Sequence, residues 1–166
     1  MNQVVVTHTG AVTAMGDDLE TLWQGLVDKQ TAITTATRFA TDNYISSCAA
    51  LINDLVPGSK TAMVFQLAEM LMEQLPPLPR ETLVLTASTK GGIEALEAAR
   101  RKTEISKEQL IISSLPDYIT RRLGLVHQGI NISAACTSST IALAKAASFI
   151  ASGRCSSVLV LAVDII

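Results

Sequence analysis

The residue of this sequence best placed to do chemistry is a cysteine at the junction of a predicted strand and a predicted helix. The stretch INISAACTSSTIALAKAASFIASG (residues 130–153) begins as a short apolar run, reaches Cys136 and continues as an alanine-rich helix. At the first position of a helix, a thiol meets unpaired backbone N–H groups and the positive end of the helix dipole, and both stabilise the thiolate. We therefore predict that Cys136 is a nucleophile. The alternative is that Cys136 is one more small buried residue, as free cysteine often is.

The neighbours of this cysteine could complete a site for a thioester. The backbone N–H groups that stabilise the thiolate could also hold the oxyanion formed from a thioester carbonyl. Thr137 and Ser138 are predicted to line the substrate site, and capping of the helix is the competing use of their hydroxyls. The sequence has three cysteines, an odd number without CxxC spacing, which argues against a disulfide framework and against a zinc site. We predict no metal and no cofactor.

The helix that follows Cys136 predicts a layered surrounding. Apolar residues cover nearly every face of the segment 137–152, and Lys145 is its only charged residue. A helix that is apolar all round is a buried helix. Since an outer helix of an ordinary α/β domain has one face in water, we predict that this helix lies between two sheets.

Strand and helix patterns alternate along the rest of the chain. This alternation predicts an α/β fold with a mostly parallel sheet and right-handed crossovers. Apolar residues in 31–58 show only a weak helix or strand pattern, which predicts a loop that contains short strands at most. The expected strands are 3–7, 81–87, 130–135 and 157–164, and the expected helices are 19–27 (capped by Asp17 or Asp18), 60–75, 93–102, 107–113, 118–123 and 137–152.

Size and composition limit the class of protein. With 166 residues and few charged side chains, the chain suits one domain over 1–166, and disorder is not expected. The formal net charge of -2 gives no electrostatic reason to expect nucleic acid or an anionic membrane surface as a partner. No secretory signal and no membrane span are found in the sequence, so a cytoplasmic protein is expected. The chain stops on an apolar strand, which predicts that the domain is incomplete.

Three stretches together resemble the N-terminal portion of the β-ketoacyl synthases. The nucleophile region of that family has A-C-[ST]-[SA], then A-x-x-x-I-x-x-G, then a strand of the type V-x-V-x-G-G-[ADE]. The opening VVVTHTGAVTAMGDDLETLWQGL is similar to the family's start, and ASTKGG is similar to its G-S-G-x-G-G loop. The matching positions of the nucleophile region are Ala135, Cys136, Thr137 and Ser138, then Ile150 and Gly153, then Val158, Val160 and Asp164.

The resemblance implies a fold and a reaction. The fold would be the N-terminal half of the thiolase-like layered α/β fold, with a mostly parallel mixed sheet and a buried nucleophile helix. The reaction would be the decarboxylative Claisen condensation of a 3-oxoacyl-acyl-carrier-protein synthase, in fatty acid or polyketide-like biosynthesis. Cys136 would carry the acyl group, and the partners would be acyl carrier protein and acyl and malonyl thioesters. A homodimer would form through the strand 130–134.

The sequence departs from the family in one respect that matters for activity. Members use two histidines and a lysine from the second half of a longer chain, and neither His8 nor His127 matches those positions. We therefore expect the chain alone to be inactive in condensation. One alternative is a stand-alone, non-catalytic module that binds acyl groups or pairs with a ketosynthase. Another is an unrelated cysteine hydrolase, which would need a nearby base that the sequence does not reveal.

Overall fold

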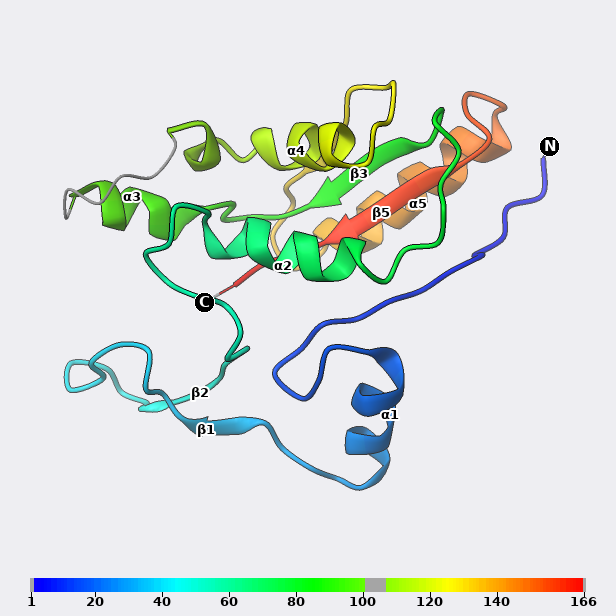
Figure 1. Cartoon of the computed structure of the whole chain (residues 1–166). Coiled ribbons are helices and arrows are strands. Elements are labelled where there is room, and N and C mark those ends of the chain that lie inside the picture. The colour runs from blue at the N-terminus through cyan, green and yellow to red at the C-terminus, as the bar shows by residue number, and fades with distance from the viewer. Residues whose placement is uncertain (1, 101–106, 166) are drawn as a thin grey trace.

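The centre of the molecule is a three-stranded parallel sheet. We describe a computed structural model of the chain, which covers residues 2–100 and 107–165. The strand order is β4 (Ile130–Ile132), β3 (Leu83–Ala87), β5 (Val158–Ala162), and the central β3 is hydrogen-bonded in parallel to both neighbours (Figure 1). The predicted α/β fold with a parallel sheet is therefore confirmed.

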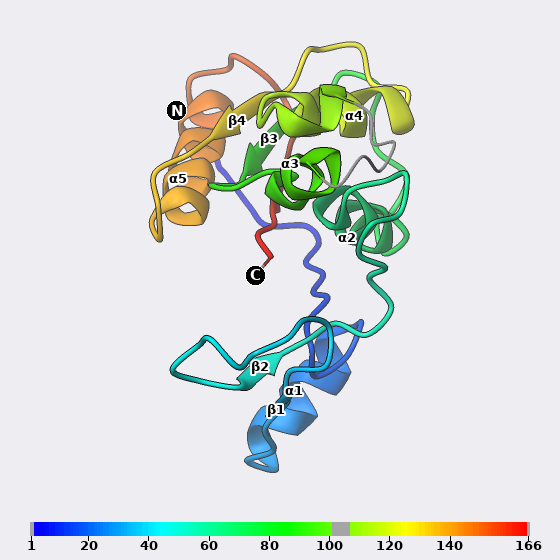
Figure 2. The same cartoon turned by 90° about the vertical axis from the view of Figure 1, so that its left-hand side faces the viewer.

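Different helices cover the two faces of this sheet, so the domain has three layers. Side chains alternate along β3: Leu85 packs toward α5 (Ser138–Ala151), whereas Val84 packs toward α2 (Met63–Met72) and α4 (Ser114–Arg122). Figure 2 shows α5 on one side of the sheet and α2 and α4 on the other. The period of two that a strand imposes on its side chains thus separates two apolar clusters.

Helix α2 contributes more buried side chains than any other helix. Its buried residues recur so closely that most of its circumference is covered, which is typical of a helix inside a core. Met63 and Met72 are buried and Met70 is partly buried, so these methionines pack in the core. The buried residues of α2 are Met63, Val64, Phe65, Leu67, Ala68 and Met72.

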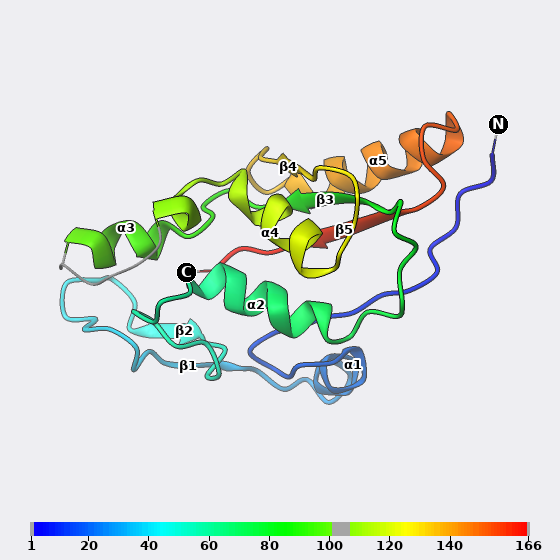
Figure 3. The same ribbon diagram turned by 45° about the horizontal axis from the view of Figure 1, so that its top comes forward.

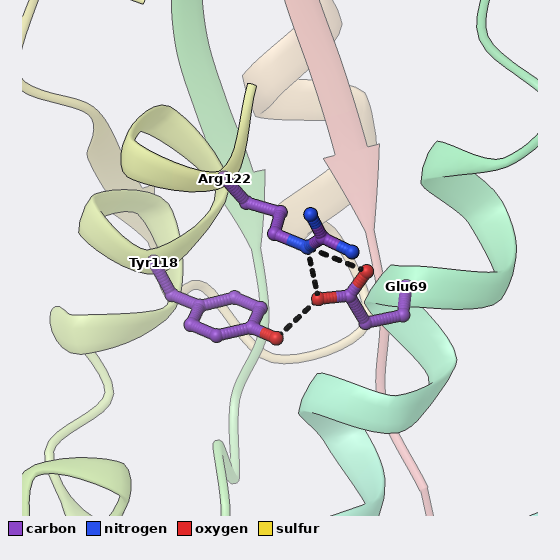
Figure 4. A network of polar contacts seen from close by, with 3 residues as sticks. All are labelled: Glu69, Tyr118 and Arg122. Atoms are coloured by element: carbon purple, nitrogen blue, oxygen red, sulfur yellow. Dashed lines mark hydrogen bonds and ion pairs between the residues drawn. The ribbon is translucent and has the colours of Figure 1, made fainter. Parts of the chain in front are cut away.

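A polar network joins α2 to α4 on this side of the sheet (Figure 4). The phenol of Tyr118 donates a hydrogen bond to Glu69, and Arg122 Nε donates to Glu69 Oε1 and Oε2 at 3.0 and 3.2 Å. The ring of Tyr118 packs edge-on against Phe65, with 5.1 Å between the ring centroids. Arg122 forms an ion pair with Glu69 while its side chain stays largely exposed.

Helix α4 begins earlier than its sequence pattern predicts. We expected a helix over 118–123, and the structure places its first residue at Ser114. Pro116 lies in the first turn of α4, where the missing N–H of proline costs no intrahelical hydrogen bond. The proline therefore belongs to the start of the helix instead of separating two segments.

The connection between the central strand and α4 contains α3 (Ile93–Arg100) and the 3₁₀ helix η1 (Lys107–Leu110). Both were expected, although the last two residues of the predicted helix 93–102 lie outside the described part of the chain. Glu94 of α3 accepts a hydrogen bond from the backbone N–H of Met63, and Gln109 Oε1 accepts one from Ala62 N at 2.6 Å. Side chains from α3 and η1 thus satisfy the first amides of α2, which has no cap of its own.

The N-terminal third holds α1 (Leu19–Val27) and the antiparallel pair β1 (Ile33–Thr35) and β2 (Cys48–Ala50). Asp18 caps α1, because its Oδ1 accepts a hydrogen bond of 2.7 Å from Thr21 N, as the sequence predicts. These elements lie on the α2 side of the molecule, apart from the central sheet (Figures 1 and 3). The apolar stripe of α1 is exposed, and Trp23 retains 62% of its accessible surface.

Residues 3–7 do not form the predicted buried strand. They run in an extended arm whose ends are held by hydrogen bonds from Asn2 N to Ala151 O at 3.4 Å and from Ala11 N to Gln74 Oε1 at 3.2 Å. Val6 in the arm is 77% exposed. A strand requires a neighbouring backbone for its N–H and C=O groups, and no described strand lies beside these residues. The prediction of a buried strand at 3–7 is therefore wrong.

Candidate functional site

Cys136 lies on a tight turn between β4 and α5. Its side chain is exposed, and α5 begins only at Ser138. The prediction that the thiol occupies the first helical position is therefore wrong by two residues. Ala135 explains the difference, because its φ of +50° is left-handed and turns the chain before the helix starts. Such a conformation is uncommon for alanine and marks local strain beside the thiol.

The hydroxyls of the two following residues hold this turn together. Ser138 Oγ accepts a hydrogen bond from Ala134 N at 2.8 Å and donates one to Ala135 O at 2.7 Å. Thr137 Oγ1 donates to Ala134 O at 2.7 Å and makes no capping bond to a helix amide. Ser138 is buried and Thr137 is exposed. The alternative that these hydroxyls cap the helix is therefore wrong, because their hydrogen bonds go to Ala134 and Ala135 and hold the turn.

The first amides of α5 lie directly after the thiol. Ile141 N is the first to form a helical hydrogen bond, to Thr137 O at 3.0 Å. Within the described part of the chain, Ser139 N and Thr140 N have no hydrogen-bond acceptor. Unpaired amides at a helix start carry partial positive charge and can stabilise an oxyanion. The turn thus combines an accessible thiol with donors for a developing negative charge.

Helix α5 is covered by the sheet on one side only. Ala142 and Ala146 are buried against Leu85 and Ile132, whereas Leu143 is 56% exposed. The prediction that α5 lies buried between two sheets is wrong for the described chain. The sheet of β3, β4 and β5 packs against one face of the helix, and the described residues provide no second sheet for the other. The apolar residues on the other face of α5 are therefore not buried by the described chain.

A second polar cluster lies where β5 leaves the sheet. Asp164 accepts hydrogen bonds from Ser88 Oγ (3.0 Å), Thr89 N (3.0 Å), Thr89 Oγ1 (2.7 Å) and Lys90 N (3.2 Å). Burial raises the pKa of Asp164, but the hydrogen bonds, first those from Thr89, lower it more, so the pKa lies below its usual value. Asp164 thus binds backbone amides of the segment ASTKGG. This segment forms the turn from β3 to α3, and two of its amides, Thr89 N and Lys90 N, donate to the carboxylate.

The sequence alone did not indicate which residues Asp164 would bind. The hydrogen-bonding residues of the turn are 74 to 76 positions away from Asp164 along the chain. Only the parallel pairing of β3 with β5 brings the two ends together. The signal that could have shown this is that both segments follow predicted strands, since the carboxyl ends of parallel strands lie at the same edge of a sheet.

The other candidate reactive residues lie away from Cys136. His8 is exposed on the N-terminal arm, and His127 Nε2 lies 3.2 Å from Glu81 Oε2 at the opposite end of β4 from the thiol. Cys48 is exposed on β2, and Cys155 follows the far end of α5. The structure therefore brings Thr137 and Ser138 next to Cys136, but no histidine.

Two kinds of feature are absent from residues 2–100 and 107–165. None of their helices combines the length and the apolar character that crossing a membrane requires. They also contain no group of three or more His, Cys, Asp or Glu side chains arranged to bind a metal ion.

Comparison with known proteins identifies the family. The sequence model of the β-ketoacyl synthase N-terminal domain matches residues 60–166, which is more than half of the chain. No curated protein matches the sequence. The fold is similar to that of a solved ketosynthase, ApeO in complex with its chain length factor ApeC from Xenorhabdus doucetiae, with a TM-score of 0.63 and 17% identity. That alignment covers 87% of this chain and 42% of the ketosynthase. The thiolase-like fold and the N-terminal resemblance are thus confirmed, and the chain belongs to the β-ketoacyl synthase family.

Proposed function

We propose that this chain is the N-terminal part of a 3-oxoacyl-acyl-carrier-protein synthase and that Cys136 accepts the acyl group. The reaction would be the decarboxylative condensation of fatty acid or polyketide-like biosynthesis. The observation that carries the proposal is the position of Cys136, exposed on the turn between β4 and α5 and followed by unpaired helix amides. Residues 1–166 would act as one N-terminal domain.

The proposed acyl transfer uses the thiol on the turn, the first amides of α5 and the substrate. The thiolate of Cys136 attacks the carbonyl carbon of an acyl thioester and forms a carbon–sulfur bond. The oxyanion of the tetrahedral intermediate is stabilised by the first amides of α5. The intermediate collapses with loss of the carrier thiolate, which takes up a proton. Thr137 is exposed beside the thiol and would contact the thioester, while buried Ser138 would act by holding the turn.

The condensation that follows would require residues that this chain does not place at the thiol. In the family, two histidines and a lysine assist the decarboxylation of the malonyl thioester. Neither His8 nor His127 lies on the turn that carries Cys136. We therefore propose that the chain alone accepts an acyl group and does not condense it.

The partners follow from the same proposal. An acyl carrier protein would deliver the acyl and malonyl thioesters. A homodimer would form through residues 130–134, and two features of β4 support this: it is an edge strand of the sheet, and its first residue, Ile130, is 45% exposed. An unpaired edge of this kind can be extended by a strand of another chain.

A second candidate function is a non-catalytic partner module for a ketosynthase. The observation that favours it is the exposed apolar side of α5, which includes Leu143 and leaves the thiol uncovered. ApeO, the ketosynthase with the similar fold, was solved in complex with a chain length factor. A chain of this second kind would bind a complete synthase and would not be acylated.

Acylation by a simple thioester tests both candidates. The purified chain is incubated with the N-acetylcysteamine thioester of hexanoic acid, and peptides are mapped by mass spectrometry. Cys48 and Cys155 serve as internal controls, since one is exposed and the other half-buried. One hexanoyl group on Cys136, absent from Cys136→Ala, supports the first function. Equal labelling of Cys48 and Cys136 contradicts it, and an unlabelled chain that binds a full-length synthase in native mass spectrometry supports the second.

A further inference from the structure

A pocket lies at the amino end of the sheet, away from Cys136. Its volume is about 300 Å³, and its apolar lining includes Leu83, Ile130 and Phe149. Leu83 and Ile130 are the first residues of β3 and β4, and Phe149 lies in the last turn of α5. Because α5 has 14 residues at about 1.5 Å each, roughly 20 Å separates this pocket from the turn of Cys136. The pocket is therefore distinct from the acyl-accepting site.

The end of α5 fixes a cation at the rim of this pocket. Gly153 has a φ of +72°, Gly153 N donates to Ile150 O at 3.0 Å, and Arg154 N donates to Phe149 O at 2.9 Å. This pair of bonds is a Schellman motif, which brings the residue after the glycine back toward the last turn of the helix. The guanidinium of Arg154 accordingly lies over the ring of Phe149, with 5.0 Å from Cζ to the centroid.

The charge of Arg154 is not balanced by the chain. Within the described residues, no carboxylate lies within ion-pairing distance of its guanidinium. The nearby lining residue His127 pairs instead with Glu81 at 3.2 Å. Burial raises the pKa of the Cys155 thiol, an effect that Arg154 opposes only in part, so this lining residue is neutral at pH 7. The pocket thus combines three apolar lining residues with the polar side chains of His127 and Gln128 and with the charge of Arg154, which no described carboxylate balances.

These features select among anionic ligands. Arg154 covers one face of the Phe149 ring, so the aliphatic surface open to a ligand is that of Leu83 and Ile130. An aromatic acid would have to displace Arg154 in order to stack on that face. Glu81 near the rim disfavours a second negative charge, which argues against dicarboxylates and phosphates. We propose that this pocket binds a short aliphatic monocarboxylate, with the carboxylate on Arg154 and the chain against Leu83 and Ile130.

The proposal is tested by titrating the ¹⁵N-labelled chain with sodium hexanoate. The dissociation constant expected for a ligand of this size is roughly 1–20 mM. Saturable shifts are expected for the amides of Leu83, Ile130 and Cys155, and hexan-1-ol should bind more weakly. Arg154→Met keeps the apolar stem over Phe149 and should weaken hexanoate binding roughly fivefold, since it removes the guanidinium that no described carboxylate neutralises. Lys145→Met removes the same charge from the exposed middle of α5 and should bind as the unchanged chain does.

Any of the following outcomes overturns the proposal. Shifts that do not saturate, equal binding of hexanol and hexanoate, or unchanged binding to Arg154→Met would show that Arg154 does not hold a carboxylate. Equal loss of binding in Lys145→Met would show a general charge effect. Shifts confined to the amides around Cys136 would place the ligand at the acyl-accepting turn. A well-dispersed spectrum of Arg154→Met provides the check that this variant is folded.

Discussion

Tyr118 donates the hydrogen bond of its phenol to Glu69 and thereby ties α4 to α2 over one face of the sheet. Arg122 contacts the same carboxylate, so one acid on α2 receives two donors from successive turns of α4 (Figure 4). Burial, and then Glu69, raise the pKa of Tyr118 to about 12. The position of α4 matters for the proposed site because Gly129, just before β4, packs closely against Pro116 of α4.

Removing the phenol hydroxyl is expected to destabilise the chain modestly. Tyr118→Phe should lower the free energy of unfolding by about 1 kcal/mol at pH 7, since one partly buried hydrogen bond is lost. Above pH 10 the difference should shrink, because the folded pKa of about 12 exceeds the ordinary value of 10.0. The contribution of the neutral phenol is complete below pH 10 and is lost as the pH rises through 12. Denaturant unfolding at a series of pH values measures this.

The second tyrosine of the chain provides the matched control for this prediction. Tyr44 is exposed and makes no hydrogen bond through its hydroxyl within the described residues, so Tyr44→Phe should leave stability unchanged. That variant also leaves Tyr118 as the only phenol, because the sequence has two tyrosines. The ultraviolet absorbance of tyrosinate in Tyr44→Phe should therefore titrate near pH 12. A midpoint near 10 would contradict the buried hydrogen bond to Glu69.

Loss of the charge on Asp164 is expected to loosen the turn after β3. Asp164→Asn should cost about 1 kcal/mol at neutral pH, a value reduced from that of buried charged hydrogen bonds because the side chain is partly exposed. The folded pKa of Asp164 is lowered, so its contribution is present above the unfolded pKa and disappears as the pH falls through the folded pKa. The variant should therefore lose less stability than the unchanged chain on acidification below about pH 4.

Asp42 serves as the control for this charge. It is exposed and has no hydrogen-bond partner among the described residues, so Asp42→Asn should leave the thermal midpoint unchanged. Equal destabilisation by the two substitutions would show that net charge, and not the hydrogen bonds from Thr89 and Lys90, causes the effect. Amide exchange at Thr89 and Lys90 gives a local measure, since both amides donate to Asp164.

Relief of strain beside the thiol is expected to stabilise the chain. Ala135 has a φ of +50°, so Ala135→Gly should raise the free energy of unfolding by about 0.5–1 kcal/mol. The reverse change is available at Gly124, where φ is +65° and an added Cβ meets no atom within 4 Å. Gly124→Ala should destabilise by a similar amount. If Ala135→Gly leaves the free energy of unfolding unchanged or lowers it, the left-handed turn at Ala135 is not strained.

Because the sheet covers only one face of α5, substitutions on its two faces should differ in their effect on stability. Leu143→Lys changes a residue that is 56% exposed and should alter the free energy of unfolding by less than about 0.5 kcal/mol. Ala146→Leu adds volume at the buried face and should cost about 1–3 kcal/mol. Thermal unfolding of the two variants checks this. A severe loss in Leu143→Lys would show that a further layer, such as a second copy, covers α5 in solution.

Local patterns were sufficient for most elements of the fold. The cap at Asp18, the buried run of β3 and the glycine-ended helix α5 depend on residues close in sequence, and they lie within two residues of the expected bounds. The strand predicted at 3–7 does not form. Its apolar residues are visible in the local sequence, but the local sequence does not show whether a neighbouring strand is present to share its backbone hydrogen bonds. The helix expected over 118–123 begins earlier, at Ser114, because Pro116 lies in its first turn. A proline can end one helix or begin another, depending on its position in the turn.

The candidate site was predictable in its residues and less so in its geometry. The cysteine, the two hydroxyls and Asp164 follow from spacing and from the family resemblance. The exposure of Cys136 and of one side of α5 depends on which layers surround the helix. The sequence of a helix shows which of its faces are apolar, but it does not show which other elements cover those faces. The left-handed turn at Ala135 carries no residue-type signal, because alanine seldom adopts it.

The central position of β3 has a consequence for the order of folding. Thr86 contacts Asn131 on β4, and Thr82 contacts Ser157 next to β5, across 45 and 75 residues of sequence. At a synthesis rate of about 5–20 residues per second, the last partner of β3 leaves the ribosome roughly 4–15 s after the strand itself. Both edges of this apolar strand are open until β4 emerges, and one edge stays open until β5 emerges, so the nascent chain needs protection from aggregation before the sheet can close around β3.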